Sequence, residues 1–174
     1  ICKDLSIHEI ALEISKCADI IYFSARKLGS AKGGAIVMDD KALYDSYKLP
    51  ARASSKTAGY DFYLINDIEI KPGEIIKIPT GIKSYFEGDE CLLIIVKSGT
   101  GFKYNIRLVN QIGLIDSDYY NNPDNEGHMF VKIQNHGDKT VSFKAGEAVA
   151  QGIFMKYLTT QNDIVLGKTR RSDK

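Results

Sequence analysis

From about residue 47 the chain consists of short β-branched and aromatic runs, each ended by a turn signal. The turns contain Pro-Gly, Gly-Asp, Asn-Pro-Asp and Ala-Gly steps, and they recur about every 8 to 15 residues. Such a pattern is typical of an antiparallel barrel or jelly roll, in which few sheet edges stay exposed. We therefore predict a mainly β domain over residues 47–158, built as an antiparallel jelly roll or distorted β-barrel.

One of these runs, HMFVKIQN, alternates along its length. Successive side chains of a strand point to opposite faces of the sheet, so alternating residues share a face. The pattern predicts a strand with one face formed by Met129, Val131 and Ile133 and the other by Phe130, Lys132 and Gln134.

The N-terminal part has a different pattern. Apolar residues recur at three- and four-residue spacings over residues 5–21, the stripe of an amphipathic helix, and Ser6 with Glu9 provides a capping box. Short apolar runs follow at Ile20–Phe23 and Ala35–Met38, separated by a polar, Gly-rich stretch. We predict the order helix, strand, loop, strand.

The segment CADIIYFSARKLGSAKGGAIVMDDKALYD resembles the cofactor-lysine region of the tryptophanase and tyrosine phenol-lyase family of pyridoxal-phosphate enzymes. The resemblance implies that Lys27 stands at the Schiff-base lysine and that Gly33 and Gly34 lie on a following loop. The cofactor also needs a phosphate cup, a partner for its pyridine nitrogen and a stacking ring, which this sequence does not supply. We interpret residues 1–46 as a helix-containing appendage that resembles a lyase fragment, with a pyridoxal-phosphate protein as the alternative.

Charge and apolar content argue against several kinds of partner. The chain has 23 basic and 22 acidic residues and a formal net charge of +1, so no global attraction to nucleic acid or membrane is expected. The longest apolar run, Cys91–Val96, is too short to span a bilayer, and the N-terminus does not read as a signal peptide. We expect a cytoplasmic protein.

The cysteines and histidines show no metal-ligand spacing such as CxxC, so a zinc site is not expected. They are scattered along the chain at Cys2, Cys17, Cys91, His8, His128 and His136. We predict that Cys17 and Cys91 are reduced and buried as small apolar residues.

An acid in the run GLIDSDY is a candidate catalytic group. Asp116 follows Leu114 and Ile115 at a predicted strand end, where a carboxylate can orient and deprotonate a water. A turn-forming aspartate is the alternative. Tyr119 is either a ring that stacks on a ligand or an ordinary strand aromatic.

A second polar cluster, KSGTGFK, begins at Lys97. The small residues Ser98–Gly101 let backbone N–H groups approach a phosphate, with amines supplied by Lys97 and Lys103. A hairpin turn explains the same glycines. Gln151 places an amide in an otherwise small, apolar run, so it needs a hydrogen-bond partner, either structural or a ligand.

The order and spacing of these clusters resemble the trimeric dUTP pyrophosphatases. AGYD, KSGTG, NQIGLIDSDY, GEAVAQ and a basic C-terminal tail are similar to motifs one to five of that family, over about residues 47–171. GLIDSDY is closely similar to the third motif of bacterial members. The resemblance implies a jelly roll of the dUTPase type that hydrolyses dUTP to dUMP and pyrophosphate, which keeps uracil out of DNA.

The family roles are carried over to the matching positions. Asp116 would activate the water that attacks the α-phosphorus, with Mg²⁺ bridging the triphosphate oxygens. Asp61 would support the metal-water shell or its basic neighbour. The expected phosphate ligands are Lys97, Ser98, Gly99 and Gln151.

The resemblance also implies how the base and sugar are chosen. A hairpin through Gly101–Gly113 would satisfy the Watson–Crick face of uracil, helped by the side-chain amide of Asn110 and the close packing of Gly113. Cytosine would leave buried groups unpaired, and a thymine methyl would clash. Tyr119, packed on the sugar, would exclude a ribose 2′-hydroxyl.

Three features depart from the family pattern. Lys97 stands where the family usually has an arginine, so the charge is kept but the planar fork is lost. The loop Tyr120–His128 is longer than the usual Arg-Gly turn and is expected to alter access to the site. The Gly-rich fifth motif, expected after TRRSDK, is not in the sequence; Arg170 and Arg171 are the candidates for its start, within a flexible tail over residues 159–174. If the protein itself lacks this motif, we expect nucleotide binding with much reduced turnover; whether the motif follows the given sequence stays open.

The family resemblance implies a homotrimer with active sites at its interfaces. Two alternatives share the fold: a nucleotide-binding or regulatory protein with weak catalysis, and a dCTP deaminase. Asp116 followed by Tyr119 fits the hydrolase better than the deaminase.

Overall fold

The computed structural model describes residues 20–24, 34–38 and 48–167. The chain divides into two compact units, Ile1–Tyr47 and Lys48–Lys174. This division lies where the sequence changes from the N-terminal pattern to short β runs. Each unit is described by itself.

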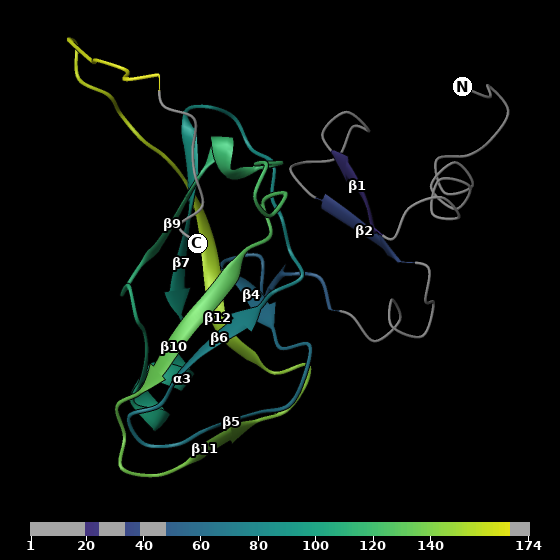
Figure 1. Ribbon diagram of the computed structural model, residues 1–174, viewed down its shortest axis with the longest axis vertical. Helices are drawn as coiled ribbons and strands as arrows, with labels where there is room; N and C mark the ends of the chain where they lie inside the picture. The colour runs from purple at the N-terminus through teal and green to yellow at the C-terminus, as the bar shows by residue number, and fades with distance from the viewer. Residues whose placement is uncertain (1–19, 25–33, 39–47, 168–174) are drawn as a thin grey trace, which may run out of the picture. The chain divides into compact units, whose positions relative to one another are not determined.

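In the first unit, two strands pair as an antiparallel ribbon. They are β1 (Ile20–Ser24) and β2 (Gly34–Met38), shown in Figure 1, and they confirm both strands predicted for this part of the chain. The predicted helix over residues 5–21 lies outside the described residues, except at its end. There the prediction is wrong, because Ile20 and Ile21 belong to β1, as their β-branched side chains favour.

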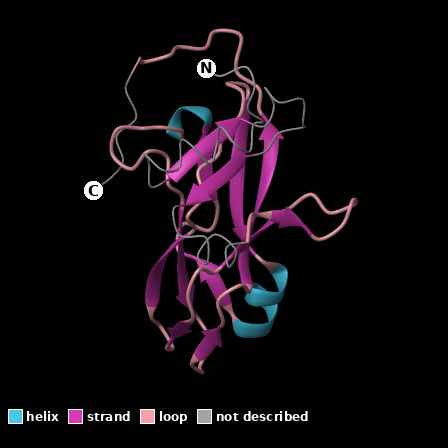
Figure 2. Ribbon diagram, turned by 90° about the vertical axis from the view of Figure 1, so that its right-hand side faces the viewer, coloured by secondary structure: helices cyan, strands magenta, loops and turns pink. Residues whose placement is uncertain are grey.

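Strands are the main regular elements of the second unit, and they are drawn in magenta in Figure 2. Their bounds are β3 (Ala51–Arg52), β4 (Tyr60–Tyr63), β5 (Ile68–Ile70), β6 (Ile75–Pro79), β7 (Glu90–Val96), β8 (Ile106–Leu108), β9 (Gly113–Asp116), β10 (Phe130–Asn135), β11 (Val141–Phe143) and β12 (Ala148–Lys156). Short runs ended by Gly, Pro and Asn turns fold into short strands, as the sequence pattern predicts.

These strands form three antiparallel sheets. The largest has the order β3-β4-β12-β7-β9, the second β6-β10-β8, and the smallest β11-β5. Figure 1 shows β12 beside β7 and β10 beside β6. The predicted fold class, mainly β with antiparallel sheets, is confirmed.

One apolar core joins the sheets of the second unit. Phe62 and Ala150 of the five-stranded sheet belong to the same buried cluster as Ile78 and Val131 of the three-stranded sheet. Burial of apolar area on two facing sheets is the main stabilising contribution in a fold of this kind. The core therefore fixes the five-stranded sheet, which carries most of the candidate site residues.

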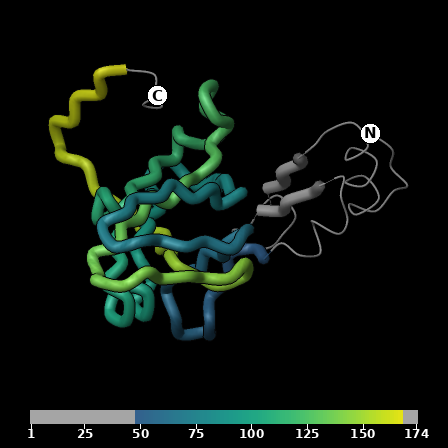
Figure 3. Tube along the Cα trace, turned by 60° about the horizontal axis from the view of Figure 1, so that its bottom comes forward, coloured from purple at the N-terminus to yellow at the C-terminus, as the bar shows by residue number. Residues whose placement is uncertain are grey.

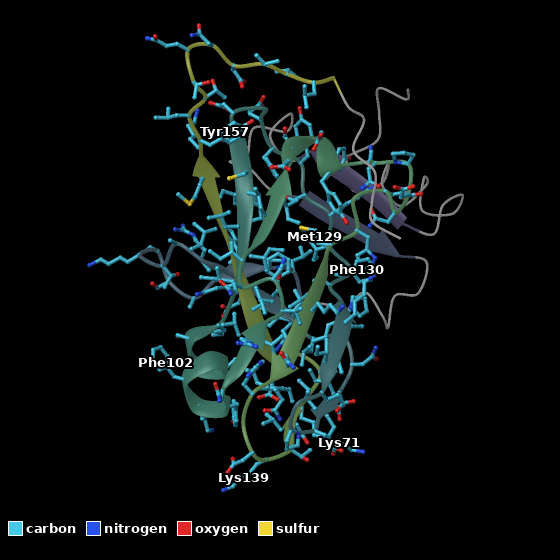
Figure 4. The ribbon with its side chains drawn as sticks, turned by 60° about the vertical axis from the view of Figure 1, so that its left-hand side comes forward. Lys71, Phe102, Met129, Phe130, Lys139 and Tyr157 are labelled. Carbon is cyan, nitrogen blue, oxygen red and sulfur yellow. The ribbon has the colours of Figure 1, made fainter. Side chains whose placement is uncertain are left out.

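Strand β10 shows the predicted alternation. Met129, just before the strand, and Ile133 within it are fully buried, Val131 is nearly so, and Lys132 is exposed. Figure 4 shows Met129 among the strands, whereas Phe102 projects outward from the short helix. The two faces of this segment are therefore set by its sequence.

The polar run after β7 forms a helix, α3 (Ser98–Tyr104), so the hairpin turn considered for SGTG is wrong. Seven residues are too few to show a helical apolar period, and only Thr100 among them is buried. Asn105, in the left-handed conformation at φ 52°, ends the helix. Tertiary contacts stabilise it, such as the Tyr104 ring packed edge-on against Phe143 at 5.3 Å between centroids.

The described chain after β12 makes few contacts. Tyr157 bonds through its N–H to the Asp89 carbonyl, but Leu158 is 97 % exposed and Ile164 is 82 % exposed. Figure 3 shows this segment, in yellow, running away from the strands. The predicted mobility of residues 159–174 stays a prediction.

Cys91 is buried and unbridged, as predicted, whereas Cys2 and Cys17 lie outside the described residues. No helix in the described part of the chain is both long enough and apolar enough to cross a membrane.

The candidate site residues lie on strands of the second unit and on the short elements that follow them.

The alternation of β10 leads to a test of the fold. Ile133→Ala removes a fully buried side chain, and we expect it to lower the free energy of unfolding by about 2–5 kcal/mol through lost burial and the cavity left behind. Lys132→Ala, the neighbouring exposed position, should change it by less than about 0.5 kcal/mol. Urea unfolding at one fixed protein concentration measures both. Equal losses would contradict the assignment of the two faces.

Candidate active site

Strands β4, β12 and β7 lie side by side and bring three predicted site residues together. In the register of the sheet, Gln151 on β12 stands between Asp61 on β4 and Ile95 on β7. Lys97 directly follows β7, and its N–H donates to the Val149 carbonyl at 3.0 Å. The sheet thus places a carboxylate, an amine and an amide next to one another.

Lys97 and Asp61 form an ion pair. Lys97 Nζ lies 2.5 Å from Asp61 Oδ2, and the two side chains are 36 % and 11 % exposed. An ionised carboxylate that has lost most of its water needs a close partner of this kind. The ammonium group has three donors, so the pair leaves Lys97 able to donate to a second acceptor.

Gly59 determines where the Gln151 side chain can lie. A Cβ added at Gly59 would stand 2.7 Å from Gln151 Oε1, closer than any real Cβ contact. Only glycine leaves room for the amide beside β4. Sequence reasoning did not single out this residue, although a glycine directly before a strand was a signal for close approach.

Ser98 and Gly99 begin α3 immediately after the ion pair. The first N–H groups of a helix have no acceptor within it, and Lys97 at the cap makes no side-chain cap bond. A Cβ at Gly99 would meet nothing within 4 Å, so a ligand can approach this backbone closely. We call Asp61, Lys97, Ser98, Gly99 and Gln151 the Lys97 cluster.

The other predicted residues gather along β9 and the turns that flank it. Gly113 pairs with Ile94 and Asp116 with Cys91, so Asp116 ends its strand as predicted. A Cβ at Gly113 would stand 3.3 Å from Ile94 Cβ and 3.8 Å from Asn110 Nδ2. Tyr119 follows in the 3-10 turn η2 (Ser117–Tyr119). We call Asn110, Gly113, Asp116 and Tyr119 the Asp116 cluster.

The prediction of a hairpin through Gly101–Gly113 is wrong, because the strands in this segment do not pair with each other. Its first residues belong to α3, β8 pairs with β10, and β9 pairs with β7 in a different sheet. What remains is a tight turn, in which the Gln111 N–H donates to the Leu108 carbonyl at 3.1 Å and the Ile112 N–H to the Asn110 carbonyl at 2.6 Å.

One chain does not bring the two clusters together. Asp116 stands opposite Cys91 at the start of β7, whereas Lys97 follows the end of the same strand. Six residues of extended chain separate their positions along the sheet by about 20 Å. Neither cluster alone contains both Asp116 and Lys97.

The phenol of Tyr119 is anchored at its hydroxyl. The hydroxyl donates to the His128 carbonyl at 3.1 Å and accepts from Asn125 Nδ2 at 2.8 Å. The ring itself is partly buried against the core. Both partners belong to the loop Tyr120–His128, whose length was noted in the sequence but whose contacts were not predicted.

His128 is held in its neutral form by its surroundings. Its Nε2 accepts from the Gly81 N–H at 3.0 Å, a bond that the doubly protonated ring cannot make. Burial lowers the pKa of His128 below its ordinary value, and the nearby Lys77 lowers it further. The centroid of the His128 ring lies 4.2 Å from that of the Phe130 ring, so the two rings pack against each other.

The described residues contain no group of three or more His, Cys, Asp or Glu side chains that could hold a metal ion. Arg170, Arg171 and Lys27 lie outside the described residues. Any metal bound at this site would therefore need ligands from elsewhere, such as the oxygens of a bound phosphate group and water.

The lowered pKa of His128 predicts that the free energy of unfolding decreases as the pH falls. Because its folded-state pKa is lowered, the unfolded chain takes up the proton first as pH falls below about 6.5. The stability that neutral His128 contributes is therefore full above that pH and is lost toward lower pH. We expect the free energy of unfolding to fall from pH 7 to pH 5 (roughly the titration range of histidine), and less steeply in His128→Asn. Urea unfolding measures both, and His136→Asn, at an exposed position, is the control. Identical slopes in all three would refute this.

Comparison with known proteins identifies the family. A family model described as dUTPase matches residues 45–174. The deoxyuridine 5′-triphosphate nucleotidohydrolase of Lactococcus lactis is 44 % identical over 115 residues, covering 66 % of this chain and 77 % of that protein. The protein of the same name from Photorhabdus laumondii is 35 % identical over 130 residues, covering 72 % of this chain and 81 % of that one.

Solved structures agree with these matches. The dUTPase of Streptococcus mutans is 42 % identical, with a TM-score of 0.61 over 67 % of this chain and 94 % of that chain. The dUTPase of phage phi11 of S. aureus, at 18 % identity and a TM-score of 0.59 over 74 % of this chain and 95 % of that chain, shares the fold. The matched region contains both clusters, and the resemblance of residues 1–46 to a lyase stays a prediction. From residue 45 onward, the chain belongs to the dUTPase family.

Proposed function

We propose that this chain hydrolyses dUTP to dUMP and pyrophosphate. The observation that carries the proposal is the 44 % identity to a deoxyuridine 5′-triphosphate nucleotidohydrolase. The Lys97 and Asp116 clusters supply groups suited to a triphosphate and to an attacking water. These groups matter for the proposal because one fold can host many activities, so the activity has to be argued from the side chains of the site.

The Lys97 cluster is the proposed phosphate-binding part. Lys97 offers a positive charge held in place by Asp61. Ser98 and Gly99 offer a hydroxyl and backbone N–H groups at the start of α3, and Gln151 offers an amide placed by Gly59. Arg170 and Arg171 are proposed to add charge from the tail. Prepositioned donors of this kind stabilise a triphosphate without reorganising during the reaction.

Asp116 is the proposed general base. It ends β9, where pairing with Cys91 fixes its backbone. A carboxylate held this way can take a proton from the water as it attacks the α-phosphorus, and the electron pair of the broken bond leaves with pyrophosphate. Such help is worth about 100- to 10,000-fold in rate.

Uracil is proposed to bind at the turn from Leu108 to Gly113. The backbone N–H and C=O groups of this turn can pair with the polar edge of uracil, and Asn110 can add its amide. Cytosine presents a donor where uracil presents an acceptor, which would leave a backbone donor unpaired. Close packing of this turn, in which a Cβ at Gly113 would stand 3.3 Å from Ile94 Cβ, is proposed to exclude a thymine methyl.

Magnesium is proposed to reach the site bound to the triphosphate. The described residues offer no three-ligand cluster, and one carboxylate oxygen of Asp61 is engaged by Lys97. This donor set fits an ion that keeps water and phosphate oxygens as most of its ligands. When bound there, magnesium would neutralise charge on the phosphate oxygens.

The active site is proposed to form between chains of a homotrimer. Asp116 stands opposite the start of β7 and Lys97 follows its end, so an acid from one copy must meet an amine from another. In a closed cyclic trimer, each copy contributes its Lys97 cluster to one site and its Asp116 to another. A cytoplasmic location fits this substrate and stays a prediction.

The substrate is tested with a pyrophosphate-release assay on dUTP, UTP, dCTP and dTTP, with and without Mg²⁺. We expect dUTP to be preferred by more than about 100-fold, because cytosine leaves polar groups unpaired, a thymine methyl clashes and the Tyr119 ring leaves no room for a ribose 2′-hydroxyl. Asp116→Asn should lower turnover of dUTP by at least about 100-fold. Equal rates on all four nucleotides would refute the proposal. Binding of dUTP without turnover would instead support a regulatory nucleotide-binding protein, and deamination of dCTP the related deaminase.

The shared site is tested by mixing two inactive variants. Asp116→Asn keeps an intact Lys97 cluster, and the double variant Asp61→Asn/Lys97→Met keeps an intact Asp116 while removing both charges of the ion pair. Co-refolded in equal amounts, they should recover about a quarter of the unmodified activity, because one interface in four then joins two intact halves. Each variant refolded alone is the control. No recovery in oligomers shown to be mixed would mean that each site lies within one chain.

A further inference from the structure

The loop after Tyr119 closes back onto that residue. Asn122, which is 6 % exposed, donates from Nδ2 to the Tyr119 carbonyl at 2.8 Å. Gly127, at φ 85°, lies so close that a Cβ there would stand 2.8 Å from the same carbonyl oxygen. A backbone packed this tightly is built for one conformation. The contacts hold the main chain of Tyr119.

Asn125 holds the side chain of Tyr119 from within the same loop. Its Nδ2 donates to Tyr119 Oη at 2.8 Å and to the His128 carbonyl at 3.2 Å. Its Oδ1 accepts from Asn122 Nδ2 at 2.8 Å and from the Gly127 N–H at 3.0 Å. Two donors and two accepted bonds use the full capacity of the amide, so its orientation is fixed.

The Tyr119 hydroxyl is committed to this network. It donates to the His128 carbonyl and accepts from Asn125, so it acts as an anchor for the ring. The ring face is then the part of Tyr119 that a sugar can contact. A small tilt of the ring changes the space beside the sugar, and the hydroxyl bonds oppose that tilt.

We propose that Asn125, itself oriented by Asn122, is a positioning residue that fixes the Tyr119 ring and thereby sets the discrimination between deoxyribose and ribose. The inference rests on the proposed function, in which Tyr119 packs on the sugar of dUTP. Asn125 acts through Tyr119 and does not touch the reacting atoms. The long loop thus serves sugar selection, a role that the sequence pattern did not reveal.

The test compares the unmodified chain with Asn125→Ala, Tyr119→Phe and the double variant. Pyrophosphate release gives kcat/KM for dUTP and UTP, and calorimetry with the α,β-imido analogues of both nucleotides gives their Kd without turnover. We expect the preference for dUTP over UTP to fall about five- to tenfold in Asn125→Ala, because the Tyr119 ring then loses the one bond that Asn125 makes to its hydroxyl. Tyr119→Phe should give a fall at least as large, because it removes the same bond together with the bond from the hydroxyl to the His128 carbonyl.

The double variant separates positioning from a general loss of structure. Because Tyr119→Phe already removes the bond that Asn125 makes to the ring, the double variant should fall no further than Tyr119→Phe alone. Asn121→Gly is the matched control: it lies in the same loop, its side chain accepts from Lys83, and its φ of 54° suits glycine. We expect it to keep the unmodified preference. If Asn125→Ala is unstable, Tyr119→Phe decides alone.

Two results would overturn the inference. The first is a dUTP-to-UTP ratio that stays unchanged in Asn125→Ala and Tyr119→Phe, or that falls equally in Asn121→Gly. The second is losses that add in the double variant. Either can occur while the unmodified chain hydrolyses dUTP, which leaves the proposed function standing. If the unmodified chain neither hydrolyses dUTP nor binds its imido analogue, the proposed function and this inference fail together.

Discussion

The pairing of β12 with both β4 and β7 is the constraint on which the rest of the site depends. It sets Gln151 beside Asp61 and places Lys97 within reach of that carboxylate. The register cannot slip, because a Cβ at Gly152 would stand 2.8 Å from Phe62 Cε2 and 2.9 Å from Leu92 Cδ1. A shift of one residue would turn Gln151 into the core and an apolar side chain out of it. The same register of β12 therefore determines both the packing of the core and the geometry of the site.

Lys97, at the position where the family resemblance implies an arginine, is engaged by the ion pair with Asp61. Asp61 is mostly buried and needs one close cation, and a flexible four-carbon stem reaches it from the end of β7. An ammonium group donates in three directions, so it can bond a carboxylate and still meet a phosphate. The planar, bidentate contact of arginine is lost, and the charge is kept. The phosphate contact proposed for Lys97 therefore has less directional control than an arginine would give.

The strands were predictable, and the local exceptions were not. Alternation in β10 and turn residues between runs follow from side-chain direction and backbone sterics, which act within a few residues. The α3 helix escaped prediction because SGTGFKY has no apolar period and is stabilised by contacts such as Tyr104 with Phe143. The Asp61–Lys97 distance depends on two strands joined through β12, so only the family resemblance implied it. The Asn125–Tyr119 bond depends on how a loop folds back, which composition does not encode.

The separation of the two clusters along β7 divides the work of the enzyme as well as its residues. The charge proposed to meet the phosphates stands after the end of β7, while Asp116, the turn proposed to bind uracil and the anchored ring stand along β9 and its flanking turns. A chain by itself can hold each half in its working geometry, because each is fixed by its own sheet pairing or loop network. In the proposed trimer, assembly then has only to bring two prepared surfaces together. Because the proposed selection of base and sugar resides in one half, a change in the loop around Tyr119 is expected to alter selectivity without disturbing the Asp61–Lys97 ion pair.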